Sequence, residues 1–61
     1  MPIVNIALWE GRDKETKRKL IQSVSKAVAD SLGIDIDRVE IILNDVPKDN
    51  WGKSGEQASE L

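Results

Sequence analysis

IVNIAL, residues 3–8, has the period of a β-strand. Residues 4, 6 and 8 fall on one face of an extended chain, and residues 3, 5 and 7 fall on the other. Both faces are largely apolar, which is typical of a strand covered on both sides. Glu10-Gly11-Arg12-Asp13 then ends the strand, and its glycine favours a turn.

A helix is expected over residues 14–32, with Asp13 as the N-cap and Gly33 just past the C-terminal end. Its apolar residues recur at three- and four-residue spacing and form one stripe. They are Leu20, Ile21, Val24, Ala27, Val28 and Leu32. Polar residues lie mostly off the stripe and predict a solvated face. They are Lys17, Arg18, Lys19, Gln22, Lys26 and Asp30.

Residues 38–44, RVEIILN, predict a second strand, with Arg38 and Glu40 on the same face about 6.5 Å apart. Strand, helix and strand at this spacing predict a β-α-β unit with parallel strands and a right-handed crossover. Residues 45–61 hold Trp51 among turn residues and predict a loop or short hairpin with a frayed end. The fold class is therefore α/β (or α+β), in one domain over residues 1–61.

Composition narrows the function classes. The 61 residues contain no His, no Cys and no Tyr, and the net charge is −2. Disulfides, ordinary metal sites and nucleic-acid binding are therefore not expected. No apolar run is long enough to span a membrane, so we expect a cytoplasmic protein without a cofactor. A two-stranded sheet with one helix leaves an apolar face open, which predicts a homo-oligomer.

Pro2 is the candidate for catalysis. If Met1 is removed, Pro2 becomes a free secondary amine, which is the most plausible group in this chain to titrate near neutral pH. An apolar pocket and a cation such as Arg12 nearby would lower the pKa of that amine and keep it neutral. The alternative is that Pro2 simply opens an edge strand.

Pro2, the pattern LWEGR at 8–12, the amphipathic helix and VPKDNWGKSGE at 46–56 occur together in this order. As a set they resemble the 4-oxalocrotonate tautomerase family over almost the whole chain. The resemblance implies dimers with a four-stranded sheet, and three dimers to a hexamer. It also implies that Pro2 moves the proton of a small enol or dienol acid, that Arg12 binds the substrate carboxylate, and that Trp51 lines the pocket.

The chain departs from the family pattern at several positions. Glu40 stands where the resemblance implies a second arginine, and a carboxylate there would repel a dianionic substrate. Trp9 and Lys53 stand at apolar wall positions. Arg38 or Lys53 would have to supply the missing positive charge. These departures change the charge that a substrate would meet and leave the residues of the fold and the Pro2 amine in place.

Each assignment has an alternative. Arg12 can be a solvated turn residue, and Trp51 an anchor between subunits. Glu40 can form an ion pair with Arg38 or Lys53, or activate water, as a carboxylate does in hydratases and dehalogenases of the superfamily. The function expected is a tautomerase, an isomerase of 2-hydroxymuconate-like 2-hydroxy or 2-oxo acids. The alternatives are a non-catalytic oligomeric protein with this fold and a hydratase- or dehalogenase-type activity.

Overall fold

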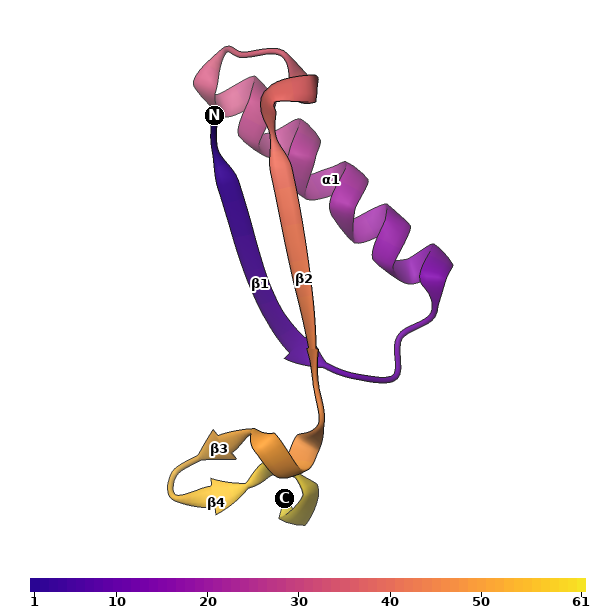
Figure 1. The fold of residues 1–61 in the computed structure, drawn as a ribbon, viewed down its shortest axis with the longest axis vertical. Coiled ribbons are helices and arrows are strands. Elements are labelled where there is room, and N and C mark those ends of the chain that lie inside the picture. The colour runs from indigo at the N-terminus through magenta and orange to yellow at the C-terminus, as the bar shows by residue number, and fades with distance from the viewer.

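The computed structural model describes residues 1–61 and contains the expected β-α-β unit (Figure 1). Strand β1 covers Ile3–Trp9, helix α1 covers Lys14–Leu32, and strand β2 covers Glu40–Val46. The two strands pair in parallel, from Ile3 opposite Glu40 to Trp9 opposite Val46. The predicted strand order and parallel pairing are confirmed.

Helix α1 begins and ends at the predicted residues. The Asp13 carboxylate accepts a hydrogen bond from the Thr16 amide at 2.8 Å. At the other end Gly33 adopts the left-handed conformation, with φ 67° and ψ 38°, and its amide donates to the Ala29 carbonyl. A residue with a Cβ adopts this conformation only at a cost, so glycine defines the helix end. None of the helices has the length and the apolar run that crossing a membrane requires.

Strand β2 begins two residues later than predicted, because a 3₁₀ turn, η1 (Ile36–Arg38), precedes it. The Arg38 amide donates to the Asp35 carbonyl at 3.1 Å, which curls the chain before it extends. The ladder starts where the Glu40 amide donates to the Pro2 carbonyl at 3.1 Å. The prediction that Arg38 and Glu40 share a strand face was therefore wrong, since Arg38 lies in the turn.

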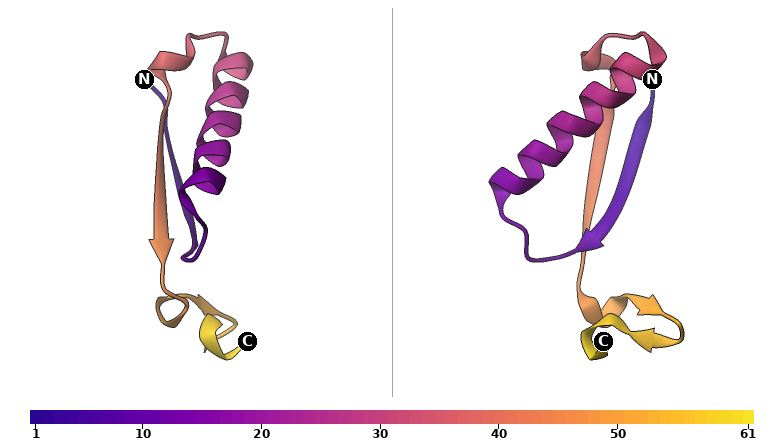
Figure 2. Two further views of the ribbon diagram at one scale, coloured as in Figure 1. Left: turned by 90° about the vertical axis from the view of Figure 1, so that its right-hand side faces the viewer. Right: turned by 180° about the vertical axis from the view of Figure 1, so that it is seen from behind.

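Helix α1 covers one face of the sheet and leaves the other face open (Figure 2). On the open face Ile3 is 53% exposed and Ile42 is 46% exposed. The apolar strand side chains of the helix side are half-buried, namely Val4, Ile6, Leu8, Ile41 and Leu43. The sheet thus has apolar side chains on both faces but a covering layer on only one.

One copy of the chain is too extended to hold a core of its own. Its radius of gyration is 14.3 Å, whereas a compact domain of this length has about 10.5 Å. Its accessible surface is 4716 Å², against about 3,950 Å² for a compact monomer of this mass. Ser25, Ala29 and Ala58 are the only buried residues. The fold therefore leaves surface that only another molecule can cover.

Residues 47–61 form a C-terminal arm that extends away from the β-α-β unit (Figure 1). The arm contains η2 (Lys48–Asn50), β3 (Gly52–Lys53), β4 (Glu56–Gln57) and η3 (Ala58–Glu60). The two short strands pair antiparallel, which confirms the predicted hairpin. After the hairpin, Ala58 is 4% exposed and its amide donates to the Trp51 carbonyl at 2.8 Å, whereas the last residue, Leu61, is 66% exposed.

Candidate active site

Pro2 lies directly before β1, at the end of the sheet where β2 begins. Its carbonyl accepts the Glu40 amide, so Pro2 and Glu40 are neighbours at the first rung of the ladder. Pro2 is half-buried and Met1 is 87% exposed. Turn η1, which contains Arg38, lies at this same end of the sheet (Figure 1). Three of the predicted site residues therefore lie at this end of the sheet: Pro2, Arg38 and Glu40.

The remaining predicted residues lie at the other end of the sheet and in the arm. Trp9 ends β1, and its ring meets that of Trp51 edge to face, with centroids 6.0 Å apart and planes at 77°. The Lys48 ammonium lies 4.7 Å from the centroid of the Trp9 ring, within the range of a cation–π contact. Lys53 is exposed on β3.

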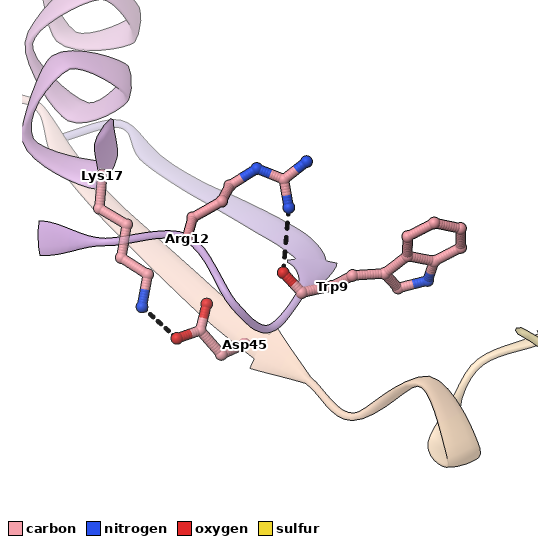
Figure 3. Close-up of polar contacts among 4 residues, drawn as sticks. All are labelled: Trp9, Arg12, Lys17 and Asp45. Carbon is pink, nitrogen blue, oxygen red and sulfur yellow. Dashed lines mark hydrogen bonds and ion pairs between the residues drawn. The ribbon is translucent and has the colours of Figure 1, made fainter. Parts of the chain in front are cut away.

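Arg12 lies in the loop between β1 and α1. One of its terminal nitrogens donates to the Trp9 carbonyl at 3.0 Å, which turns the guanidinium back over the end of β1 (Figure 3). Arg12 is exposed, and its remaining N–H groups make no hydrogen bond within the chain. The side chain is thus anchored at one nitrogen and available for a ligand at the others.

The predicted site residues do not meet within one chain. Pro2 and Trp9 are seven residues apart along an extended strand, which corresponds to about 23 Å. The expectation that Arg12 lowers the pKa of the Pro2 amine is therefore not met by the Arg12 of the same chain. The charged residues at the Pro2 end of the sheet are Glu40, whose amide donates to the Pro2 carbonyl, and Arg38 in η1. The structure separates the predicted residues into two groups. Pro2, Arg38 and Glu40 lie at one end of the sheet, and the others lie at the opposite end or in the arm, namely Trp9, Arg12, Trp51 and Lys53.

An ion pair between Lys17 and Asp45 was missed by the sequence analysis, which placed Lys17 on a solvated face. The contact joins the first turn of α1 to the end of β2, across 28 residues of sequence (Figure 3). Its position in the helix could have indicated this contact, because Lys17 precedes the apolar residues Leu20 and Val24 by three and seven residues. Lys17 therefore lies in line with the buried side of the helix.

Two side chains of the helix region have shifted pKa values. The Thr16 hydrogen bonds lower the pKa of the Asp13 carboxyl, and the Asp30 partner raises the pKa of Lys26. The indole nitrogen of Trp9 is buried without a hydrogen-bond partner. No three acidic, His or Cys side chains gather closely enough to hold a metal ion. The candidate residues offer the chemistry of an amine, a guanidinium and carboxylates.

A parallel β-α-β unit with a proline at the head of β1 and a short C-terminal hairpin defines a small protein of the tautomerase fold. The family model described as "Tautomerase enzyme" matches residues 2–60. The chain therefore belongs to the tautomerase family, as a small isomerase of the 4-oxalocrotonate tautomerase type. The family resemblance and the fold predicted from the sequence are confirmed.

Relatives cover nearly the full length of the chain. A 2-hydroxymuconate tautomerase from Pseudomonas putida is 44% identical over 61 residues, which are 100% of this chain and 97% of the relative. A structure from work on the 4-oxalocrotonate tautomerase isozymes of Methylibium petroleiphilum has a TM-score of 0.91 at 40% identity, covering 95% of this chain and 94% of that chain. The structure of a heterohexamer 4-oxalocrotonate tautomerase from Chloroflexus aurantiacus has a TM-score of 0.94 at 31% identity. The match covers 100% of this chain and 98% of that chain.

Proposed function

We propose that this chain isomerises small unsaturated 2-hydroxy and 2-oxo acids of the 2-hydroxymuconate kind, with the Pro2 amine as the general base. The observation that carries the proposal is a proline at position 2 in a chain that is 44% identical, over all 61 residues, to a 2-hydroxymuconate tautomerase. A proline nitrogen within the chain is an amide and has no basic lone pair, so removal of Met1 is part of the proposal. Met1 is 87% exposed.

The reaction needs one group that both accepts and returns a proton. The neutral Pro2 amine takes the proton of the enol, and the resulting ammonium returns a proton to a carbon of the conjugated system. The hydroxyl becomes a carbonyl, and the proton count of substrate and enzyme is unchanged. A base of this kind works best when its pKa lies near the operating pH. Exclusion of water around Pro2 in an assembly would lower the pKa of the amine toward that range.

The site requires two copies of the chain. Arg12 binds the substrate carboxylate through a bidentate pair of charged hydrogen bonds. Since Arg12 and Pro2 of one copy lie at opposite ends of β1, the Arg12 group that completes a site belongs to another copy. Trp51 and Trp9 line the pocket from the same side as Arg12, because they form one cluster with it. The exposed apolar sheet face supplies the surface on which copies associate.

The proposed assembly is therefore a homo-oligomer, a hexamer built from three dimers. The relative from Chloroflexus aurantiacus is described as a heterohexamer, which supports an assembly of this size. Light scattering at micromolar chain concentration tests the point. We expect a mass of six chains. A folded monomer would contradict the proposal, because the site would then be incomplete.

A hydratase-type activity is the second candidate, and the position of Glu40 favours it. The backbone amide of Glu40 donates a hydrogen bond to the Pro2 carbonyl. The Glu40 residue therefore lies at the same end of the sheet as the proposed base. A carboxylate next to a bound unsaturated acid can activate a water molecule for addition. In that case hydrated product would form from the same acids, and Glu40→Gln would abolish hydration while leaving tautomerisation in place.

The deciding experiment uses protein whose intact mass shows that Met1 has been removed. Turnover of 2-hydroxymuconate is followed by ultraviolet absorbance, with protein that retains Met1 as the matched control. We expect activity in the first sample and a large loss in the second, because retention of Met1 converts the base into an amide. Equal rates in both samples would rule out Pro2 as the base, and no turnover in either would favour the non-catalytic alternative.

A further inference from the structure

The loop that carries Arg12 is held at both ends by consecutive residues of β2. On the β1 side, the Glu10 amide donates to the Val46 carbonyl at 3.1 Å. On the α1 side, Lys17 forms an ion pair with Asp45 (Figure 3). The last residues of β2 thus fix both the exit from β1 and the entry into α1. Arg12 lies on the short span between these two points.

The Lys17–Asp45 contact differs from the other ion pairs of the molecule. Its side chains are 28% and 36% exposed, whereas those of Lys26 and Asp30 are 73% and 67% exposed. The Lys26–Asp30 pair joins two residues of the same helix, four positions apart. Lys17–Asp45 instead joins the helix to the sheet. Partial burial reduces screening by solvent, so this pair restrains the helix more than an exposed pair would.

We propose that Lys17 and Asp45 are positioning residues, which set the place of the Arg12 guanidinium for carboxylate binding. The inference rests on the function proposed above, in which Arg12 binds the substrate carboxylate. A bidentate contact tolerates little displacement, and a functional group has to be held to within about 0.5 Å by its supporting residues. The Arg12 side chain has a single anchor of its own, the Trp9 carbonyl. The ion pair supplies the second restraint by fixing the helix end of the loop.

Loss of the ion pair should affect binding more than chemistry. The carboxylate contact is made in the bound substrate and in the transition state alike, so weakening it raises KM with little change in kcat. A displacement of about 1 Å can cost up to about 100-fold. For Lys17→Met we expect KM for 2-hydroxymuconate to rise by about 10-fold, while kcat stays within about 2-fold of the unmodified protein.

Two controls separate positioning from general stability. Lys26→Met breaks an exposed ion pair on the same helix and should leave KM unchanged. Lys17→Arg keeps a cation opposite Asp45 and should restore most of the affinity. A neutral enol, that of phenylacetaldehyde, lacks the carboxylate that Arg12 binds. Its KM should therefore not respond to Lys17→Met.

The possible results are distinct. An unchanged KM in Lys17→Met, or an equal rise for the neutral enol, would overturn the positioning role. If Lys17→Met does not assemble, Asp45→Asn removes the same charge pair at nearly constant volume and carries the same expectation. Absence of turnover in the Met-free natural sequence would overturn the proposed function, and this inference with it. Turnover with an unmoved KM would overturn the inference alone.

Discussion

Trp9 and Trp51 meet edge to face, with ring centroids 6.0 Å apart and ring planes at 77°. The contact joins the end of β1 to the C-terminal arm, which otherwise extends away from the β-α-β unit (Figure 1). Lys48, from the arm, adds a cation on the Trp9 ring. The side chain of Trp9 is therefore the point at which the body of the molecule holds the arm.

Trp51→Ala should loosen the arm without unfolding the sheet. An edge-to-face pair contributes about 0.5–1.5 kcal/mol beyond its buried area, so amide exchange in residues 47–61 should become about 2- to 10-fold faster. The Ala58 amide, bonded to the Trp51 carbonyl, is the most direct reporter. Hydrogen exchange read by mass spectrometry measures the effect. Trp51→Phe keeps an aromatic edge and is the matched control. Unchanged exchange in Trp51→Ala would show that the pair does not hold the arm.

Pro2→Ala should reduce kcat/KM by about 100-fold or more in Met-free protein. The change replaces a secondary amine with a primary amine of different basicity and geometry, and a general base typically contributes about 10²–10⁴-fold. Steady-state kinetics with 2-hydroxymuconate measures the loss. Ile3→Val, one residue further along β1, leaves the amine intact and is the control. A loss smaller than about 10-fold would argue that Pro2 is not the base.

Glu40→Arg should favour diacid substrates. In the proposed site Glu40 lies beside Pro2 and lowers the positive potential that a second carboxylate of the substrate would meet. Reversing the charge should raise kcat/KM for a diacid dienol by about 10-fold, which corresponds to about 1.4 kcal/mol, and should change a monoacid less.

Glu40→Gln separates the removal of a negative charge from the gain of a guanidinium donor. All three proteins are measured with 2-hydroxymuconate and with an arylenolpyruvate. If the negative charge itself disfavours diacids, the ratio of kcat/KM for the diacid to kcat/KM for the monoacid should be intermediate in Glu40→Gln, between the natural protein and Glu40→Arg. A constant ratio in all three would place Glu40 outside the field of the site.

Acid should weaken the start of α1 through Asp13. The Thr16 hydrogen bonds lower the pKa of this carboxyl from its ordinary value of 3.8. The folded state therefore binds this proton less readily than the unfolded chain does. The resulting stabilisation is present above about pH 3.8 and is lost as the pH falls through the lowered folded value.

Asp13→Asn keeps a capping side chain without the charge, so its melting temperature should fall less steeply than that of the natural sequence below about pH 4. Melting curves at pH 7, 5 and 3, at one chain concentration, measure the difference. Asp37→Asn, at an exposed carboxylate in η1, is the control. Parallel pH profiles for Asp13→Asn and the natural sequence would contradict the capping argument.

Local pattern predicted the fold because each element carries its own signals. The two-residue period of β1 and the Asp13 and Gly33 caps fixed β1 and α1 to within one residue. The predicted start of β2 lies two residues before the observed one, since nothing in RVEIILN distinguishes an extended Arg38 from an Arg38 in a 3₁₀ turn. That turn depends on the Asp35 carbonyl and on where the ladder with Pro2 begins.

The site was predicted only in part because its geometry depends on contacts distant in sequence. Residue types made Pro2 and Arg12 the candidates, but the sequence analysis placed them in one site although a predicted strand lies between them. The Lys17–Asp45 pair joins residues 28 positions apart, and the charge of Lys17 led to its assignment to the solvated face. The sequence carried a local sign of both relationships, namely the strand at 3–8 between Pro2 and Arg12 and the spacing of Lys17 from Leu20, but which residue Lys17 meets follows only once the two strands are paired.

The separation of Pro2 from Arg12 along β1 determines how mutant and intact chains would combine in a mixed assembly. In the assembly proposed above, every site draws its base from one copy and its carboxylate-binding group from another. A chain that has lost Arg12 would therefore inactivate the site that holds a neighbour's intact Pro2, so a defective allele would be partly dominant. Conversely, when a chain defective at Pro2 pairs with one defective at Arg12, both defects fall in the same site and the other site is whole. Two alleles that are each inactive would thus restore activity to one another.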